Sequence, residues 1–349
     1  MTVTLPSSSG IAESPPTRPP TIAEIAREAG VSVATVSKVI NGRADVSAET
    51  RARVEAVIRA RGYRRSGRTT RVAPLVEVVF HELESEWALE IIRGVERAAR
   101  EHGLAVVLSD LQGRRTADRR WIDGVLARRP TGVIAVLANL TEEARALLRT
   151  RRIPLVVVDP TGEPLHDTPS IGATNWSGGL AATRHLLRLG HRRIGIIAGP
   201  AQILCSRARL DGFRAAMDEA GVPIDPELVR YGNFHVREGI REGRELLRLP
   251  DPPTAIFAFN DLQALGVYQA AREARLHIPD DLSVVGFDDL PIARWVGPPL
   301  TTVRQPLREM AAVATDLIAR LAADEAPEQT RIELSTQLVV RESSAPPRR

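Results

Sequence analysis

A short segment near the N-terminus carries side chains that suit contact with a nucleic acid. Ser32, Thr35 and Ser37 supply hydroxyl groups close together, and Lys38 follows them directly. Lys38 is the only lysine of the chain, whose other long basic side chains are all arginines. Hydroxyl and ammonium groups donate hydrogen bonds to phosphate oxygens and to base edges. With Val33 and Ala34 between them, they form a small face that fits a major groove.

The apolar residues around this segment indicate how the face is presented. Their spacing predicts three short helices, over Ile22–Glu28, Val33–Asn41 and Ala48–Arg61. Ala29 and Gly30 permit a tight turn between the first two helices, which pack through Ile22, Ile25, Ala26, Val31, Val36 and Val39. This inward packing turns the residues from Ser32 to Lys38 outward. We therefore predict a three-helix headpiece with a helix-turn-helix over residues 21–63.

Cap residues and charge support this assignment. Thr21 with Glu24 forms a capping box, while Ser32 and Ser47 stand at the N-cap positions of the second and third helices. Residues 1–72 hold 12 Lys and Arg against 6 Asp and Glu, although the whole chain carries a net charge of only +4. The positive charge thus lies at the N-terminal end. It favours a nucleic-acid partner, although a solvated basic surface is the simpler alternative.

Two segments beside the headpiece have the composition of irregular chain. Residues 1–20 are rich in Ser, Pro and Thr and are expected to form a disordered leader. Residues 64–74 are expected to form a basic linker, because arginines alternate there with Gly, Ser and Thr without apolar periodicity. These arginines either contact phosphates or a narrow minor groove, or they form only a solvated tether.

The remainder of the chain alternates strand-length apolar runs with helix-period segments. The predicted strands are Leu75–Phe80, Leu104–Leu108, Gly132–Leu137, Leu155–Asp159, Ile194–Ala198, Ala255–Phe259 and Ser283–Phe287. The predicted helices are Ala88–His102, Ala117–Arg128, Gly178–Leu189, Arg207–Ala220 and Leu262–Ala274. Such alternation indicates parallel doubly wound sheets. Residues 75–343 are long enough for two α/β lobes with a cleft between them, and residues 344–349 are expected to be a disordered tail.

Several protein classes are disfavoured. No apolar run approaches the roughly 18 residues that span a bilayer, and no export signal is recognisable. Cys205 is the only cysteine, which excludes an intrachain disulfide and fits a reducing cytoplasm. Phosphate-binding and dinucleotide-binding glycine motifs, a nucleophile elbow and a spaced Cys/His metal set are absent, so we expect neither cofactor nor metal. An enzyme stays as the second class, with His81, Asp159, Asp288 and Asp289 as acid–base candidates.

The headpiece resembles that of the LacI/GalR family of bacterial transcriptional repressors. The resemblance rests on Gly30-Val-Ser-x-x-Thr-Val-Ser37 and on Val46-Ser-x-x-Thr-Arg51. It implies that Val33, Ala34 and Lys38 read bases, while Ser32, Thr35, Ser37 and Asn41 mostly fix phosphates. The connector departs from the family pattern, because it lacks a motif resembling Ala-Arg-x-Leu-Ala for a hinge helix. Insertion of a leucine into the minor groove is therefore not expected.

The resemblance continues over the core, in Leu187-x-x-Gly-His-Arg-Arg-Ile194, Phe259-Asn-Asp, Ile278-Pro-Asp-Asp-Leu-Ser-Val-Val-Gly-Phe-Asp-Asp289 and Pro299-Leu-Thr-Thr-Val-Arg-Gln305. It implies a core similar to periplasmic sugar-binding proteins, with the ligand between the lobes. Arg209, Asn260 and Asp288 match the family's polar contacts, and Phe234 matches an aromatic that covers the ligand. His81, Trp87, Asp159 and Gln305 are further candidates. Each of these aromatic and acidic side chains could instead be packed or cap a loop.

The resemblance implies a dimeric repressor of a sugar catabolism operon, released from double-stranded operator DNA by a small carbohydrate. A fork of Arg, Asn and Asp groups suits vicinal hydroxyls, and an aromatic face suits the C–H side of a ring. A neutral pentose or its oligomer is the favoured effector, and a nucleobase is the alternative. A three-helix docking protein and a free sugar-binding module are the competing classes, and specific operator binding would discriminate them.

Overall fold

The computed structural model describes residues 21–40, 46–61, 72–83, 85–161 and 168–348 of the 349-residue chain. The chain divides into two compact units, with the boundary between Arg71 and Val72. We refer to the first unit as the headpiece and to the second as the core. The expected leader, most of the expected linker, and Asn41 lie outside the described residues.

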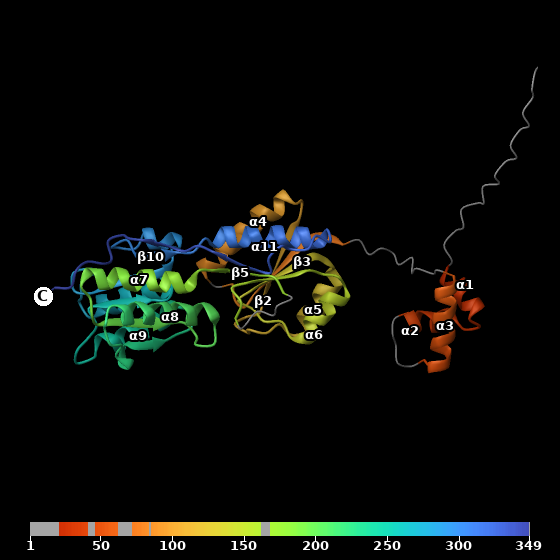
Figure 1. The fold of residues 1–349 in the computed structure, drawn as a ribbon, viewed down its shortest axis with the longest axis horizontal. Helices are drawn as coiled ribbons and strands as arrows, with labels where there is room; N and C mark the ends of the chain where they lie inside the picture. The colour runs from red at the N-terminus through yellow and green to blue at the C-terminus, as the bar shows by residue number, and fades with distance from the viewer. Residues whose placement is uncertain (1–20, 41–45, 62–71, 84, 162–167, 349) are drawn as a thin grey trace, which may run out of the picture. The chain divides into compact units, whose positions relative to one another are not determined.

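The headpiece contains three helices, α1 (Ile22–Glu28), α2 (Val33–Ile40) and α3 (Ala48–Ala60), as the sequence predicts (Figure 1). Both halves of the Thr21–Glu24 capping box are present. Gly30 has a φ of 63°, which explains a glycine at the turn between α1 and α2. A small apolar cluster joins the helices through Ile25, Ala26, Ala29, Val36, Val39 and Val54, with Ile22 and Val31 partly buried against it.

The core consists of two α/β lobes, each built on a six-stranded sheet. In the N lobe the strand order is β11 (Arg331–Leu334), β5 (Ser170–Ala173), β4 (Leu155–Val158), β3 (Pro130–Val136), β1 (Ala73–Phe80) and β2 (Ala105–Asp110). All neighbouring strands of this sheet are parallel. Their side chains are mostly Val, Ile and Ala because both faces are covered by helices. β1 begins two residues before its predicted start.

The C lobe repeats this plan. Its strand order is β12 (Gln337–Val339), β10 (Thr301–Arg304), β9 (Ser283–Asp288), β8 (Ala255–Ala258), β6 (Ile194–Ala198) and β7 (Val229–Tyr231). Only the edge pair of β10 and β12 is antiparallel among these pairings. The expected parallel, doubly wound sheets are therefore present in both lobes.

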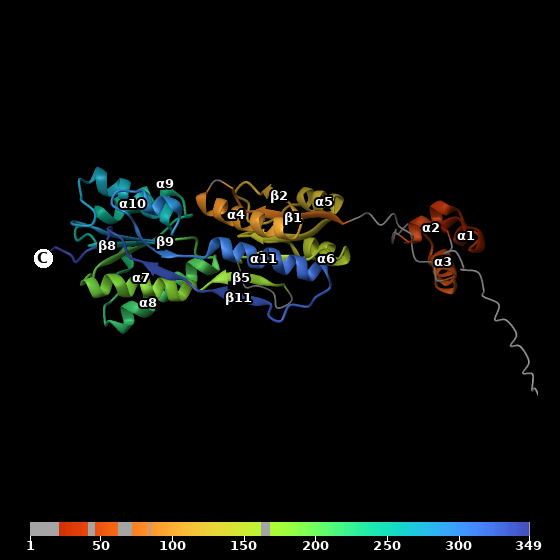
Figure 2. The same cartoon turned by 90° about the horizontal axis from the view of Figure 1, so that it is seen from above.

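Helices cover both faces of each sheet (Figures 1 and 2). In the N lobe, α4 (Glu86–Glu101) and α11 (Leu307–Ala322) bury one apolar cluster, and α5 (Arg119–Arg128) and α6 (Glu142–Thr150) bury another. In the C lobe, α7 (Asn175–Leu189) and α8 (Leu204–Glu219) cover one face. The other face packs against α9 (Val236–Leu247) and α10 (Asp261–Glu273). Two short 3₁₀ helices, Pro226–Leu228 and Pro291–Arg294, complete the C lobe.

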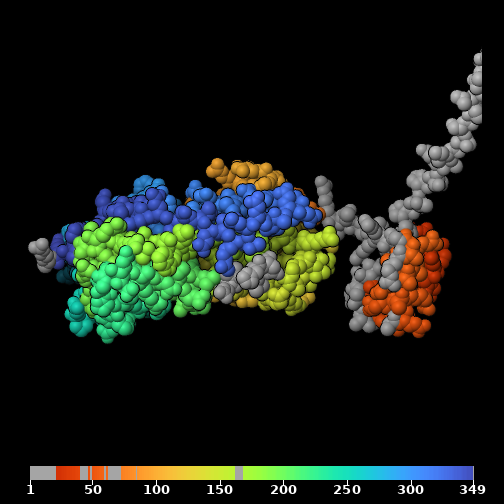
Figure 3. All heavy atoms as spheres, viewed as in Figure 1, coloured from red at the N-terminus to blue at the C-terminus, as the bar shows by residue number. Residues whose placement is uncertain are grey.

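The chain crosses between the lobes three times, after β5, after β10 and after β11. Residues late in the chain therefore contribute to both lobes, as the blue surface in Figure 3 shows. At two crossings Thr174 and Thr336 bind one another, with 3.0 Å between their hydroxyl oxygens. Thr336 N–H also donates to Thr174 Oγ1 at 2.9 Å. These bonds tie two of the crossing segments together.

The expectation of a disordered tail over 344–349 is wrong for residues 344–348. Ala345 N–H donates to Ser283 Oγ at 3.0 Å, and the buried ring of His191 binds both Ser283 Oγ and Ala345 O. Arg348 pairs with Asp280 and Asp281 at 2.9 and 2.6 Å. Sequence composition missed this because the segment lacks apolar periodicity and is fixed by polar groups of the C lobe instead.

Candidate functional site

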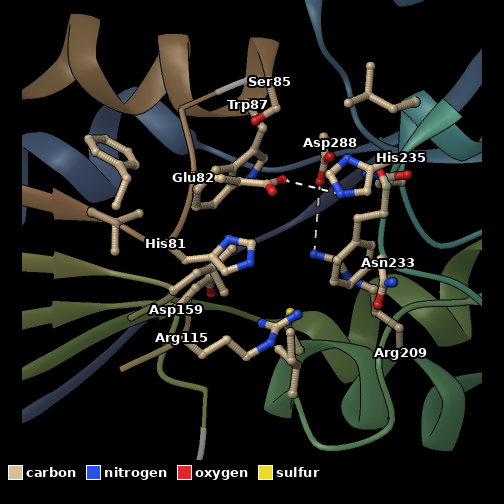
Figure 4. A pocket seen from close by; sticks show the side chains of 18 residues that line it. His81, Glu82, Ser85, Trp87, Arg115, Asp159, Arg209, Asn233, His235 and Asp288 are labelled. Carbon is tan, nitrogen blue, oxygen red and sulfur yellow. Dashed lines mark hydrogen bonds and ion pairs between the residues drawn. The ribbon is translucent and has the colours of Figure 1, made fainter. Parts of the chain in front are cut away.

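A cavity of about 60 Å³ lies between the two lobes of the core, at the carboxyl ends of their parallel strands (Figure 4). This is the edge at which open α/β sheets bind ligands. The N lobe contributes residues that follow β1, β2, β3 and β4 and the start of α4. The C lobe contributes the first turns of α8 and α10, the segment before α9 and the end of β9. The principal polar and aromatic lining residues are His81, Glu82, Trp87, Arg115, Asp159, Arg209, Asn233, Phe234, His235, Asn260 and Asp288.

Strained backbone gathers at this cavity. Leu137, Asp159, Phe234 and Asp288 all line it and all have positive φ, with values of 47°, 47°, 68° and 117°. Residues other than glycine adopt such conformations at a cost of about 1 to 3 kcal/mol each, and these conformations cluster at functional sites. The packed sheets hold this strain in the segments that shape the cavity wall.

On the C-lobe side, Arg209 is held from several directions. Its Nε donates to Asn175 Oδ1 at 2.9 Å, and Nη1 donates to the backbone oxygen of Phe259. The guanidinium carbon lies 3.6 Å from the centre of the Phe287 ring. Nη2 lies 3.9 Å from Asp288 Oδ1, and both side chains are only 3% exposed. Arg209 therefore presents one edge to the cavity in a fixed orientation.

Asp288 is a buried acid beside that guanidinium. Gln305 Nε2 donates to its Oδ1 at 2.6 Å. Burial raises the pKa of Asp288 to about 7, because removal from water penalises the carboxylate more than Arg209 stabilises it. Asp288 can thus donate or accept a hydrogen bond near neutral pH, which suits ligand hydroxyl groups.

Asn260 and Phe234 are coupled to one another. The side chain of Asn260 accepts from Gln263 N–H at 2.8 Å, capping α10, and donates to Phe234 O at 2.8 Å. The ring of Phe234 lies against Gly199, where an added Cβ would come within 2.0 Å of ring carbon. A glycine is needed there because any side chain would displace the ring. The aromatic face is therefore positioned by its neighbours.

The N-lobe side carries polar groups without such support. The side chains of His81, Arg115 and Asp159 form no hydrogen bond with any residue that the structure describes. Burial, together with the positive charges of Arg115 and His235, lowers the pKa of His81 to about 4. Burial raises the pKa of Asp159 to about 6, although Arg209 opposes the shift. These groups retain hydrogen-bonding capacity toward the cavity.

One pair of side chains spans the cavity. Glu82 follows β1 of the N lobe, and His235 stands at the N-cap of α9 in the C lobe. Their Oε1 and Nε2 atoms lie 3.5 Å apart, and the dashed line in Figure 4 marks this pair. Both side chains are partly exposed. The pair is ionic only when the imidazole is protonated.

Of the predicted effector residues, seven line the cavity: His81, Trp87, Asp159, Arg209, Phe234, Asn260 and Asp288. Gln305 does not line it and instead holds Asp288. Sequence reasoning missed Arg115, Asn233 and His235, whose only signal was their position after strands. Asp289 points elsewhere and pairs with Arg304 and Arg341.

The headpiece presents the predicted DNA-reading face. Ser32, Val33, Ala34 and Lys38 are exposed, whereas Thr35 and Ser37 are half-buried. Val33 is 46% exposed, so its methyl groups are available for apolar contact. The hydroxyl of Ser32 accepts from Thr35 N–H at 3.1 Å and binds the Thr35 hydroxyl at 2.8 Å. Ser32 is thus the N-cap of α2, as predicted, and its hydroxyl is partly used within the helix.

Comparison with known proteins places both units. Residues 21–66 match the model of bacterial regulatory proteins of the lacI family, and residues 183–344 match a periplasmic binding protein-like domain. The ribose operon repressor of Escherichia coli (strain K12) is 34% identical over 334 residues, covering 93% of this chain and 99% of the relative.

Solved structures agree over most of the chain. The transcriptional regulator CelR–cellobiose complex is 34% identical with a TM-score of 0.71, covering 93% of this chain and 99% of that one. The lac repressor dimer bound to operator and the anti-inducer ONPF is 27% identical with a TM-score of 0.68, covering 94% and 100%. The chain therefore belongs to the lacI family of bacterial regulatory proteins.

Proposed function

We propose that this protein is a homodimeric repressor that binds double-stranded operator DNA and is released from it by a small carbohydrate. The observation that carries the proposal is the presence of two sites in one chain. The headpiece exposes a small helix face with a single lysine, and the core encloses a polar, aromatic-lined cavity at strand ends. Neither a docking bundle nor a free binding module needs both.

On the DNA side, we assign Val33, Ala34 and Lys38 to base contacts. We assign phosphate contacts to Ser32, Thr35, Ser37 and Asn41, of which Asn41 lies outside the described residues. A single headpiece buries little surface, so tight binding needs two of them on a palindromic operator. The relative solved as a dimer on its operator supports this arrangement. We also propose a cytoplasmic location, because the operator DNA of a bacterium lies there.

On the effector side, we assign Arg209, Asn260 and Asp288 to ligand hydroxyls and Phe234 and Trp87 to the apolar faces of a sugar ring. His81 and Asp159 act from the N lobe, and Gln305 orients Asp288. The enclosed volume of about 60 Å³ is smaller than the roughly 150 Å³ of a cavity that admits benzene. A sugar ring therefore requires the lobes to separate. Such movement couples the cavity to DNA affinity, typically by about 1 to 3 kcal/mol.

We further propose that the cavity binds its ligand without catalysing a reaction. The carboxyl group of Asp288 accepts a hydrogen bond from Gln305 and lies beside Arg209, so it already has protein partners that a general acid or base would have to give up. Among the residues that the structure describes, no three His, Cys, Asp or Glu side chains could hold a metal ion together. None of the described helices is long and apolar enough to cross a membrane.

The test is fluorescence anisotropy of purified protein with DNA from the region upstream of its own gene, at fixed salt, with and without a panel of sugars and nucleobases. Fixed salt is required because phosphate contacts dominate affinity. We expect specific binding that one sugar abolishes. Release by a nucleobase alone would overturn the carbohydrate assignment, and failure to prefer this DNA over a scrambled sequence would overturn the repressor assignment.

Lys38→Ala separates the two sites. We expect operator affinity to fall about tenfold or more, as the loss of one base contact implies, while effector affinity of the same protein stays unchanged. Arg97→Ala, which removes an equal charge from an exposed position on α4, is the matched control. If both substitutions weaken operator binding equally, the loss reflects the change in net charge, and the assignment of Lys38 to a base contact is wrong.

A further inference from the structure

The N-lobe wall of the cavity contains a cation that the sequence did not single out. Arg115 follows β2, and its backbone oxygen accepts from Asn139 N–H at 2.6 Å. Thr116 forms a parallel bridge with Asn139, and Ala117 N–H donates to Asn139 O at 3.0 Å. These bonds fix the loop at Arg115 and at the two residues that follow it. This anchoring directs the guanidinium toward the cavity, as Figure 4 shows.

The guanidinium of Arg115 lacks a counter-charge in direct contact. It is half-buried and has no hydrogen bond or ion pair with any residue that the structure describes. Burial lowers its pKa, although the more distant Glu82 opposes this. The neighbouring Arg114 behaves differently, because it is exposed and pairs with Asp118 at 3.0 Å. A partly buried cation without a partner is costly, and that cost falls when an anion binds.

No acid among the described residues contacts the guanidinium of Arg115 directly, although Glu82 interacts with it at longer range. Glu82, the nearby acid, pairs with His235 across the cavity at 3.5 Å. His81, on the same wall, stays neutral because burial, with smaller contributions from Arg115 and His235, lowers its pKa to about 4 against the opposing effect of Asp110. Asp159 is buried and faces Arg209 rather than Arg115 as its cationic neighbour. The wall formed by His81 and Arg115 therefore favours negative charge.

We propose that the effector is a sugar carrying an acidic group, a carboxylate or a phosphate, and that Arg115 binds this group. The inference rests on the proposed function and refines its ligand class, which the sequence alone led us to expect as neutral. A planar guanidinium binds two oxygens of a carboxylate or phosphate at once, and these oxygens carry the opposite charge that neutral hydroxyl groups do not supply. The C-lobe groups Arg209, Asn260 and Asp288 are left to bind the hydroxyls of the ring.

The first test is isothermal titration of the full chain with glucuronate, galacturonate, glucose 6-phosphate and ribose 5-phosphate. The neutral sugars glucose, galactose and ribose are titrated beside them. We expect at least one acid to bind tenfold or more tightly than its neutral counterpart, because a hydrogen bond to a charged group is stronger than one between neutral groups. Preference for uronates or for phosphates identifies the acidic group. Binding of no acid, or equal binding of a neutral counterpart, overturns the proposal.

The second test is Arg115→Gln, with Arg114→Gln as the matched control. We expect Arg115→Gln to lower the affinity for the acidic sugar about 10- to 100-fold, which corresponds to the loss of a charged contact. The affinity for the neutral counterpart should stay within about threefold of the wild-type value. Arg115→Lys keeps the positive charge but loses the paired N–H donors of the guanidinium, so its affinity for the acidic sugar should lie between those of the wild type and Arg115→Gln. Equal weakening of acid and neutral sugar by Arg115→Gln would reveal a structural role. Unchanged melting temperatures verify that the variants fold.

Operator release separates failure of this inference from failure of the proposed function. Release of operator DNA by a neutral sugar, with acids inert, would refute the acidic effector while the repressor assignment stands. Absence of specific operator binding would refute the repressor, while the ratio of acid to neutral affinity in the titrations would still decide the role of Arg115.

Discussion

The two halves of the cavity differ in how their polar side chains are held. On the C-lobe side, Arg209, Asn260 and Asp288 each make side-chain hydrogen bonds to protein groups before any ligand arrives. On the N-lobe side, the side chains of His81, Arg115 and Asp159 make none with described residues. The polar side chains of the C-lobe half are thus held by hydrogen bonds to the protein, whereas those of the N-lobe half still have donors and acceptors available for a ligand.

This difference suggests a division of labour. Groups locked by their own neighbours lose little entropy on binding and can recognise features common to many sugars, such as a ring with vicinal hydroxyls. Groups without protein partners gain most from a complementary ligand group, and they suffer most when it is missing. We therefore expect the C lobe to provide affinity and the N lobe to select among ligands.

The largest expected effect on effector binding comes from removing Arg209, the C-lobe side chain with the most contacts to the protein. In Arg209→Ala the effector should no longer release operator DNA, and effector affinity should fall more than about 100-fold. The reason is that a charged contact to the ligand is lost and that Asn175 and Phe259 O lose their hydrogen-bond donor. Anisotropy with saturating effector measures this. The exposed Arg207, two residues earlier on α8, gives the control Arg207→Ala. A variant of Arg209 that is still released normally would contradict the division proposed here.

Asp288→Asn tests how much the buried carboxyl group of the C-lobe half lowers the stability of the fold. A buried carboxyl whose pKa is about 7 rather than 3.8 stabilises the fold fully below about pH 4, and this contribution is lost as pH rises through 7. With about 1.4 kcal/mol for each pKa unit, wild-type stability should fall by up to roughly 4 kcal/mol over this range. Asparagine has no such charge, so the variant should be the more stable one at pH 8.

Urea unfolding at pH 4, 6 and 8 measures this difference. Asp289→Asn is the control, since Asp289 pairs with Arg304 and Arg341 at 2.7 and 2.5 Å. It should destabilise the core at pH 8 instead. If Asp288→Asn is also destabilising there, Arg209 compensates the buried charge fully, and the C-lobe half is held by ion pairing rather than by hydrogen bonds to neutral groups.

The same contrast explains which parts could be predicted from sequence. Helix caps and apolar periodicity are local, so α1, α2 and α3 and the strands that precede the cavity were located within a few residues. The C-lobe residues were found because they lie in motifs such as Phe259-Asn-Asp that resemble the family pattern, although the groups that hold them lie 17 to 50 residues away in the sequence. Arg115 gave no such signal, because one arginine among many in a polar loop resembles any solvated residue until Asn139 and the sheet fix its direction.

Other misses have the same origin. α6, α9, α11 and the short strands β5, β7, β10, β11 and β12 were not predicted, and several of them depend on contacts with distant parts of the chain. β11 pairs with β5 and β12 pairs with β10 after the last crossings between lobes. Local pattern cannot reveal a strand whose length is only three or four residues and whose existence depends on a partner far away in sequence.

The smallest expected effect concerns the pair that joins the two halves. Glu82 and His235 are both partly exposed, so their interaction is worth no more than about 1 kcal/mol. Glu82→Gln should therefore change effector affinity less than about fivefold and mainly speed ligand entry, because the lobes then separate more easily. Stopped-flow binding of Glu82→Gln, His235→Gln and the double variant, with Glu101→Gln as an exposed control, measures the rates of ligand entry and release. If the two side chains act as a pair, the double variant should be no faster than either single variant. Additive acceleration would mean that Glu82 acts on the N-lobe wall itself, and the pair would then affect ligand selection rather than closure of the lobes.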